Sequence, residues 1–147
     1  MIVAVVLVLA TLLARVLGIA GIGYFDGWSA AVRAGLAVML LFASSAHFNR
    51  MQADLVRMVP GWIPQLQAMV VLTGVLEWCG AVGLLSSVTQ RWAGWALIAL
   101  FVILLPANIH AARSQVTLRG KPATALSWRV PLQLLFIALT WWSACLH

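Results

Sequence analysis

Five long apolar segments dominate the chain, and most polar residues gather in the short stretches between them. The apolar segments run over 2–22, 30–48, 67–87, 92–112 and 130–146. Each is close to the roughly 20 residues that an α-helix needs to cross the hydrocarbon core of a bilayer. The pattern therefore predicts an all-α, polytopic membrane protein with five spans, folded as a single transmembrane domain over 1–147.

The first segment also has the length of a signal peptide. It lacks a positively charged start, however, and Arg15 interrupts its second half. A signal peptide begins with a basic region and continues as a short apolar core without charges. We therefore expect a retained helix.

The stretch 49–59 has a different pattern from the spans. Met51, Leu55 and Met58 share one helical face, whereas charged residues such as Arg50 fall largely on the opposite face. That arrangement predicts a short amphipathic helix at the membrane interface, with an ordinary loop as the alternative.

Composition supports a membrane protein. Apolar residues make up 64% of the chain and charged residues 8%, against about 25% charged residues in a soluble domain. The net charge of +6 would favour nucleic acid as a partner of a soluble protein. Here we expect the bilayer as the partner and no nucleic acid, because the basic residues lie mainly in short loops.

The basic residues predict the orientation. With the N-terminus inside, the outer loops hold only Arg33 and Arg91, and the inner loops hold Arg50, Arg57, Arg113, Arg119, Lys121 and Arg129. Cytoplasmic loops carry the excess of Lys and Arg. We therefore expect a multi-pass protein of the cell membrane with a cytoplasmic N-terminus and an outer C-terminus.

Glu77 is the clearest candidate for chemistry, because an ionisable residue within a span is costly and needs a reason. Gly74 and Ala81 share its helical face, and Gly80 is close by. Small residues let another helix approach, so Glu77 should face the bundle. It is either a proton carrier or substrate anchor, or a structural acid held by an ion pair or hydrogen bond.

Further polar residues lie toward the inner ends of the spans. They are His47 and Arg50 after the second span, Asn108 and His110 in the fourth, and Arg129 and Gln133 in the fifth. Pro106 should kink the fourth helix and open space for polar groups. Together with Glu77, these residues predict a polar pocket that opens inward. In it, Glu77 and His47 would handle protons, and Asn108, Gln133, Arg50, His110 and Arg129 would bind the ligand.

Arg15 is the other charge within a span. It could extend toward the outer surface or pair with Glu77 across the bundle, and the pair would make both residues structural. A metal is not expected, since His47, His110 and Glu77 lack HxxxH or ExxH spacing, and Cys79 and Cys145 form no CxxC pair.

Six motifs in order resemble the DoxX-like family of small integral membrane proteins. They are the Phe42–Phe48 stretch ending in Ala-His-Phe, Val59-Pro-Gly-Trp-Ile-Pro64, Leu72-Thr-Gly-Val-Leu-Glu77, the segment Arg91–Leu100, Pro106-Ala-Asn108 and Arg129-Val-Pro-Leu-Gln133. The resemblance covers about Arg33–Trp142 and implies a four-helix bundle, to which the first span is an N-terminal addition. The family is named for a subunit linked to thiosulfate and quinone oxidation.

These observations favour a protein that binds a lipophilic small molecule, with a quinone as the candidate, in a redox-linked role. The alternative is a non-catalytic accessory or assembly subunit of a membrane complex. The candidate partners are a membrane redox complex or further copies of the same chain in a homo-oligomer. A transporter ranks last, because the chain shows no inverted repeat. The sequence leaves open whether the protein is an enzyme.

Overall fold

The computed structural model describes residues 1–113, 117–118, 121–122 and 126–147 of the chain. The helices in this part are α1 (Ile2–Ile19), α2 (Trp28–Ser44), α3 (Gln52–Met58), α4 (Leu66–Leu85), α5 (Gln90–Arg113) and α6 (Leu126–Thr140). Three short turns complete them: η1 (Gly23–Phe25) and η2 (Ser45–Phe48) are 3₁₀, and η3 (Trp141–Cys145) is π-helical. The predicted all-α class is confirmed. The two-residue strands β1 (Thr117–Leu118) and β2 (Lys121–Pro122) pair antiparallel.

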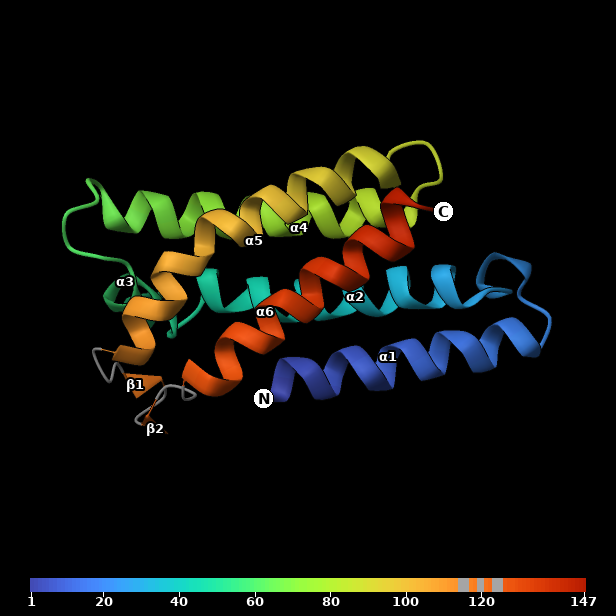
Figure 1. The fold of residues 1–147 in the computed structure, drawn as a ribbon, viewed down its shortest axis with the longest axis horizontal. Helices are drawn as coiled ribbons and strands as arrows, with labels where there is room; N and C mark the ends of the chain where they lie inside the picture. Colours follow the sequence, from blue (N-terminus) through green and yellow to red (C-terminus); the bar gives the residue numbers. More distant parts are fainter. Residues whose placement is uncertain (114–116, 119–120, 123–125) are drawn as a thin grey trace.

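The five long helices lie lengthwise in one elongated bundle (Figure 1). α1 packs against α2, α2 against α4, α4 against α5, and α5 against α6. One end of the bundle carries α3 and the β1–β2 pair, and the N-terminus lies toward that end, whereas the C-terminus lies at the other (Figure 1). We call the first the α3 end and the second the C-terminal end.

Four helices in the described part of the chain are long and apolar enough to cross a membrane. They are α1, α2 with η2, α4 and α5. Large apolar side chains also cover the outside of the bundle, including Leu9, Leu13 and Ile103, each more than half exposed. Such a surface is unusual for a protein that faces water and suits one that faces lipid. α6 is shorter, at 15 residues, and continues into η3.

The core consists of small and aliphatic side chains between closely spaced helices. Leu36, Leu84 and Leu97 are almost fully buried. Gly80 of α4 lies directly against the Leu97 side chain of α5, which leaves no room for a methyl group there. Close packing of small residues is how helices associate when lipid offers no hydrophobic drive between them.

The helices occupy the predicted segments, but their ends differ by a few residues. α6 begins at Leu126 rather than at residue 130, and α5 continues through Pro106 to Arg113. Hydropathy marks only the apolar part of a helix, while polar residues at its ends extend it. α5 also changes direction in its C-terminal part (Figure 1), the part that contains Pro106.

The amphipathic stretch after α2 is a helix, α3, which is shorter than predicted at Gln52–Met58. It packs on η2, α4 and α5, with Met58 buried. Of the basic residues expected in the inner loops, Arg119 lies outside the described residues.

Candidate functional site

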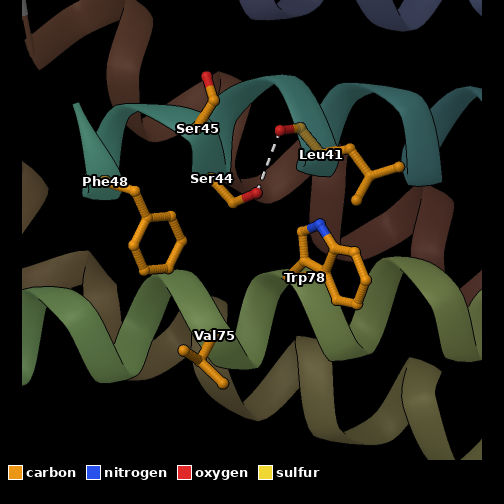
Figure 2. A pocket seen from close by; sticks show the side chains of 6 residues that line it. All are labelled: Leu41, Ser44, Ser45, Phe48, Val75 and Trp78. Atoms are coloured by element: carbon orange, nitrogen blue, oxygen red, sulfur yellow. Dashed lines mark hydrogen bonds between the residues drawn. The ribbon is translucent and has the colours of Figure 1, made fainter.

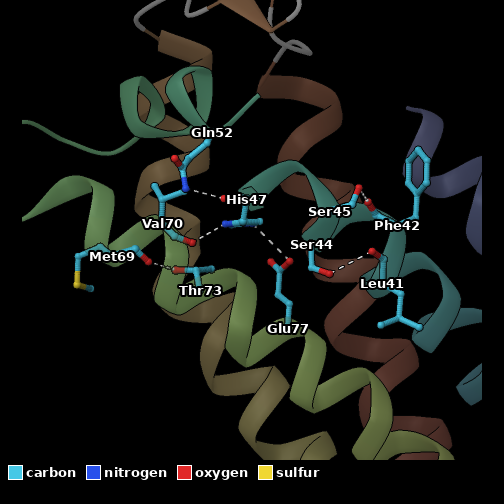
Figure 3. Close-up of polar contacts among 10 residues, drawn as sticks. All are labelled: Leu41, Phe42, Ser44, Ser45, His47, Gln52, Met69, Val70, Thr73 and Glu77. Atoms are coloured by element: carbon cyan, nitrogen blue, oxygen red, sulfur yellow. Dashed lines mark hydrogen bonds and ion pairs between the residues drawn. The ribbon is translucent and has the colours of Figure 1, made fainter. Parts of the chain in front are cut away.

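Glu77 lies on the buried face of α4, as the small residues around it predict. It is 8% exposed, and Gly74, Gly80 and Ala81 on the same helix are also buried. Its carboxyl points toward the α2–η2 segment that carries Ser44 and His47 (Figure 3). An acid in such surroundings has lost its water and depends on partners within the protein.

His47 reaches this acid from η2, where the chain leaves α2 in a tighter 3₁₀ turn. Its Nδ1 lies 2.6 Å from the Val70 carbonyl oxygen of α4. Its backbone carbonyl accepts a hydrogen bond from Gln52 Nε2 at 2.8 Å. Contacts from α3 and α4 therefore hold both the backbone and the ring of His47 (Figure 3).

The glycine at position 74 makes this approach possible. A methyl group added there would lie 2.5 Å from the His47 Cβ and 3.1 Å from Phe48 Cε2. η2 thus packs directly on the backbone of α4. The imidazole is set one helical turn from Glu77 as a consequence.

The two side chains form a pair that can share one proton. His47 Nε2 lies 3.5 Å from Glu77 Oε2. A carbonyl can only accept, so Nδ1 must carry the hydrogen that it donates to Val70. The remaining proton then resides on Nε2, giving an ion pair, or on the carboxyl, giving two neutral groups.

The Oε2 atom of Glu77 is incompletely satisfied. It is buried and has no hydrogen bond in the described part of the chain, and its separation from Nε2 is long for a hydrogen bond. Buried polar atoms are nearly always paired, so an orphaned oxygen is a reason to look for a ligand.

A second polar group joins α5 to α6. Asn108 Nδ2 donates to Gln133 Oε1 at 3.0 Å, and Arg129 Nη1 donates to Asn108 Oδ1 at 3.1 Å. Gln133 Nε2 in turn donates to the Phe101 carbonyl at 2.9 Å. The sequence pattern predicted these side chains in one pocket with Glu77. The polar contacts instead form two sets: one joins His47 to Glu77 and Val70, and the other joins Asn108, Arg129 and Gln133 between α5 and α6.

Arg15 does not pair with Glu77. Its Nη1 lies 3.9 Å from Asp26 Oδ1, and its guanidinium carbon lies 5.6 Å from the centre of the Trp28 ring. The side chain therefore extends toward the loop between α1 and α2, as expected for a charge that moves out of the apolar layer. Of the two alternatives for Arg15, the structure shows the outward extension and not the pairing across the bundle, and Glu77 has His47 instead.

Two of the predicted ligand-binding residues stand apart from both sets. Arg50 is exposed, and His110 is half-buried near the end of α5. Neither makes a hydrogen bond or ion pair with another residue that the structure describes. Nor does the described part of the chain hold a group of three or more His, Cys, Asp or Glu side chains able to bind a metal.

An apolar groove lies between α2–η2 and α4 (Figure 2), the same elements that carry His47 and Glu77. It has a volume of about 440 Å³ and is lined by Leu41, Ser44, Ser45, Phe48, Val75 and Trp78. Ser44 is buried, and its Oγ donates to the Leu41 carbonyl at 3.1 Å. The groove shares a wall with the site, because Phe48 packs on Gly74 beside His47.

The sequence did not predict that Gln52 and the Val70 carbonyl hold His47. Gln52 lies on the polar face of the predicted amphipathic helix, which marked it only as an exposed residue. A backbone carbonyl carries no signal in the sequence. The position of Gln52, five residues after His47, is the one sequence feature that could have indicated its contact with the His47 carbonyl.

Comparison with known families assigns the chain to one of them. A family model described as domain of unknown function (DUF8561) matches residues 36–144, and the chain belongs to this family. No curated protein and no solved structure matches the chain. The match begins within α2 and leaves α1 outside.

Proposed function

We propose that this chain, a member of a family described as a domain of unknown function, binds a lipophilic small molecule at Glu77 and His47. The observation that carries the proposal is a buried acid 3.5 Å from a histidine, with one acid oxygen lacking a hydrogen bond. In an apolar bundle, a polar pair of this kind is a functional site by default. The apolar groove beside it suits a ligand that arrives from the bilayer.

A quinone is the ligand class we put forward, in a redox-linked role. Interconversion of a quinone and a quinol requires protons at its oxygens, and the pair holds a proton that can move between Nε2 and the carboxyl. The electrons would come from a partner or a second ligand, since the chain has no cofactor motif. The DoxX-like resemblance agrees with this proposal.

The same resemblance supports a bundle of α2, α4, α5 and α6 with α1 as an addition. In support, α1 packs chiefly on α2, and the family match begins only at residue 36. We propose that α6 with η3 is the fifth span. Arg50, Arg57 and Arg113 lie at or near the α3 end, which favours that end as cytoplasmic.

Native mass spectrometry of gently solubilised protein tests the ligand site. We expect a stoichiometric lipophile with the wild-type chain and its loss in Glu77→Gln, which keeps the size of the side chain but cannot give up or take a proton. Thr73→Val, one turn away on α4, is the matched control. Among the described residues its hydroxyl bonds only within the helix, to the Met69 carbonyl, so the ligand should remain.

His47→Asn separates positioning from chemistry. An amide nitrogen in place of Nδ1 can still donate to Val70, whereas nothing replaces Nε2, so the variant should fold and lose the ligand. Equal occupancy in Glu77→Gln and Thr73→Val would contradict the proposal. A wild-type chain that carries no lipophile but arrives with a larger protein would favour an accessory subunit.

A further inference from the structure

The hydrogen-bonding state of the Glu77–His47 pair restricts the head of a ligand that could bind there. With Nδ1–H committed to Val70, the pair presents one proton on two facing atoms, Nε2 and Oε2. With that proton on Nε2 or on Oε2, one atom is a donor and the other an acceptor. A ligand atom within about 2.8 Å of both must therefore accept and donate at once.

A hydroxyl oxygen meets this requirement, and a carbonyl or ether oxygen does not. Beside the 3.5 Å gap between Oε2 and Nε2, a hydroxyl within reach of both atoms accepts from the protonated partner and donates to the other. A carbonyl only accepts and would leave the second atom unpaired, at the cost of a buried polar group without a hydrogen bond. The orphaned Oε2 atom is the one that such a hydroxyl would satisfy.

The groove restricts the rest of the ligand. None of its six lining residues is charged, and the polar groups of their side chains are the hydroxyls of Ser44 and Ser45 and the indole N–H of Trp78. A phosphate head would meet no cation there and would face the acid. Along α2 and η2 the lining runs from Leu41 to Phe48, which is about 10 Å at the rise of a helix, so the groove suits an apolar chain.

We propose that the ligand is a neutral lipophile with a hydroxyl head, bound between Glu77 and His47, and a single apolar chain that lies in the groove lined by Leu41, Ser44, Ser45, Phe48, Val75 and Trp78. This inference rests on the proposed function and deepens it. Of the two redox states of a quinone, it selects the quinol.

Three redox-inert probes test the hydroxyl head and the apolar chain of the ligand separately, with full-length protein in lipid nanodiscs. 4-Decylphenol has both parts, 4-methylphenol has only the head, and 4-decylanisole has the chain but no donor. The groove is filled by Val75→Trp. Val82→Trp is the matched control, since Val82 is an exposed valine of the same helix (49%, against 43% for Val75) that does not line the groove.

We expect 4-decylphenol to bind the wild type and Val82→Trp equally. In Val75→Trp its dissociation constant should rise about tenfold, the effect of losing contact with a few methylene groups. 4-Methylphenol should bind more weakly, with no difference among these three proteins. 4-Decylanisole should bind at least about tenfold more weakly than 4-decylphenol, and Glu77→Leu, which removes both carboxyl oxygens and offers no donor or acceptor, should remove the difference between them.

Different results would contradict different parts of the proposal: the position of the apolar chain, the hydroxyl head, or both. Unchanged binding of 4-decylphenol to Val75→Trp, together with its loss in Glu77→Leu, would show that the ligand's apolar chain does not lie in the groove and would leave the proposed function standing. Equal binding of 4-decylanisole and 4-decylphenol would overturn the hydroxyl head. If no probe binds although a lipophile copurifies with the wild type, the inference fails and the proposed function survives.

Discussion

Gly74 determines whether His47 can reach Glu77. Its missing side chain is the space into which the His47 Cβ and the Phe48 ring pack. The acid, the imidazole and the groove wall are therefore all placed by a residue that carries no chemistry. At this scale, the site depends on the close approach of η2 to α4 as much as on its polar atoms.

Gly74→Ala should destabilise the protein and weaken ligand binding together. A methyl group 2.5 Å from His47 Cβ forces η2 away from α4, and overpacking of this kind costs about 1–3 kcal/mol. Thermal unfolding in detergent measures the first effect, and the copurifying lipophile measures the second. Gly61→Ala is the control, because nothing lies within 4 Å of a methyl group there. Wild-type stability and binding in Gly74→Ala would show that η2 does not depend on this contact.

The residue scale also shows what the sequence could predict of the site. Glu77 stood out because it is a charge in an apolar segment with small residues on its helical face, and it is buried as predicted. Its partner did not stand out. His47 and Arg15 were both available, and the choice depends on how the helices pack, which local spacing does not record.

At the scale of elements, two arginines from different helices hold the end of the chain. Arg33 Nη1 donates to the Ser143 carbonyl at 2.6 Å, and Arg91 Nη2 donates to the Cys145 carbonyl at 3.3 Å. Carbonyls at the end of a helix have no partners within it, and cationic donors are favoured there. η3 is thereby tied to α2 and α5.

Replacing Arg33 should loosen η3. Arg33→Met keeps the apolar stem and removes the guanidinium, which leaves the Ser143 carbonyl without this donor at a cost of about 1–3 kcal/mol. Hydrogen exchange followed by mass spectrometry should show faster exchange over the C-terminal residues. Arg50→Met is the control, because Arg50 is exposed. Unaltered exchange in Arg33→Met would mean that η3 holds without this bond.

Helices were easier to predict than their ends. The long apolar segments located α1, α2, α4, α5 and α6, since a span must be apolar over most of its length. Arg33 was counted with the outer loops for the orientation, although the predicted span 30–48 contains it, and it lies within α2 (Trp28–Ser44). The charge lies one turn inside the helix, where the Ser143 carbonyl of η3 accepts a hydrogen bond from its guanidinium.

For the whole molecule, the five long helices place the N-terminus toward the α3 end and the C-terminus at the opposite end (Figure 1). If each helix crosses the bilayer, the termini lie on opposite sides. This arrangement requires that α6 also crosses. Among the described helices, only α1, α2 with η2, α4 and α5 are long and apolar enough by themselves to cross a membrane. The continuation of α6 as η3 lengthens that helix, and the arginine contacts hold that continuation within the bundle.

Cysteine labelling in intact cells tests both the fifth span and the orientation. In full-length protein with Cys79 and Cys145 changed to alanine, single cysteines replace Trp62 at the α3 end, Val88 between α4 and α5, and His147. Trp62 and Val88 are 80% and 82% exposed, so a membrane-impermeant maleimide can reach them wherever it has access. The excess of basic residues at the α3 end predicts that this end is cytoplasmic.

We therefore expect labelling of Val88→Cys and His147→Cys in intact cells, and of Trp62→Cys only after lysis. Labelling of Val88→Cys without His147→Cys would mean that α6 does not cross and that the protein has four spans. The reverse pattern, with Trp62→Cys alone accessible, would keep five spans and invert them. In that case the groove and the Glu77–His47 pair would lie nearer the outer leaflet, and a ligand would have to enter from there.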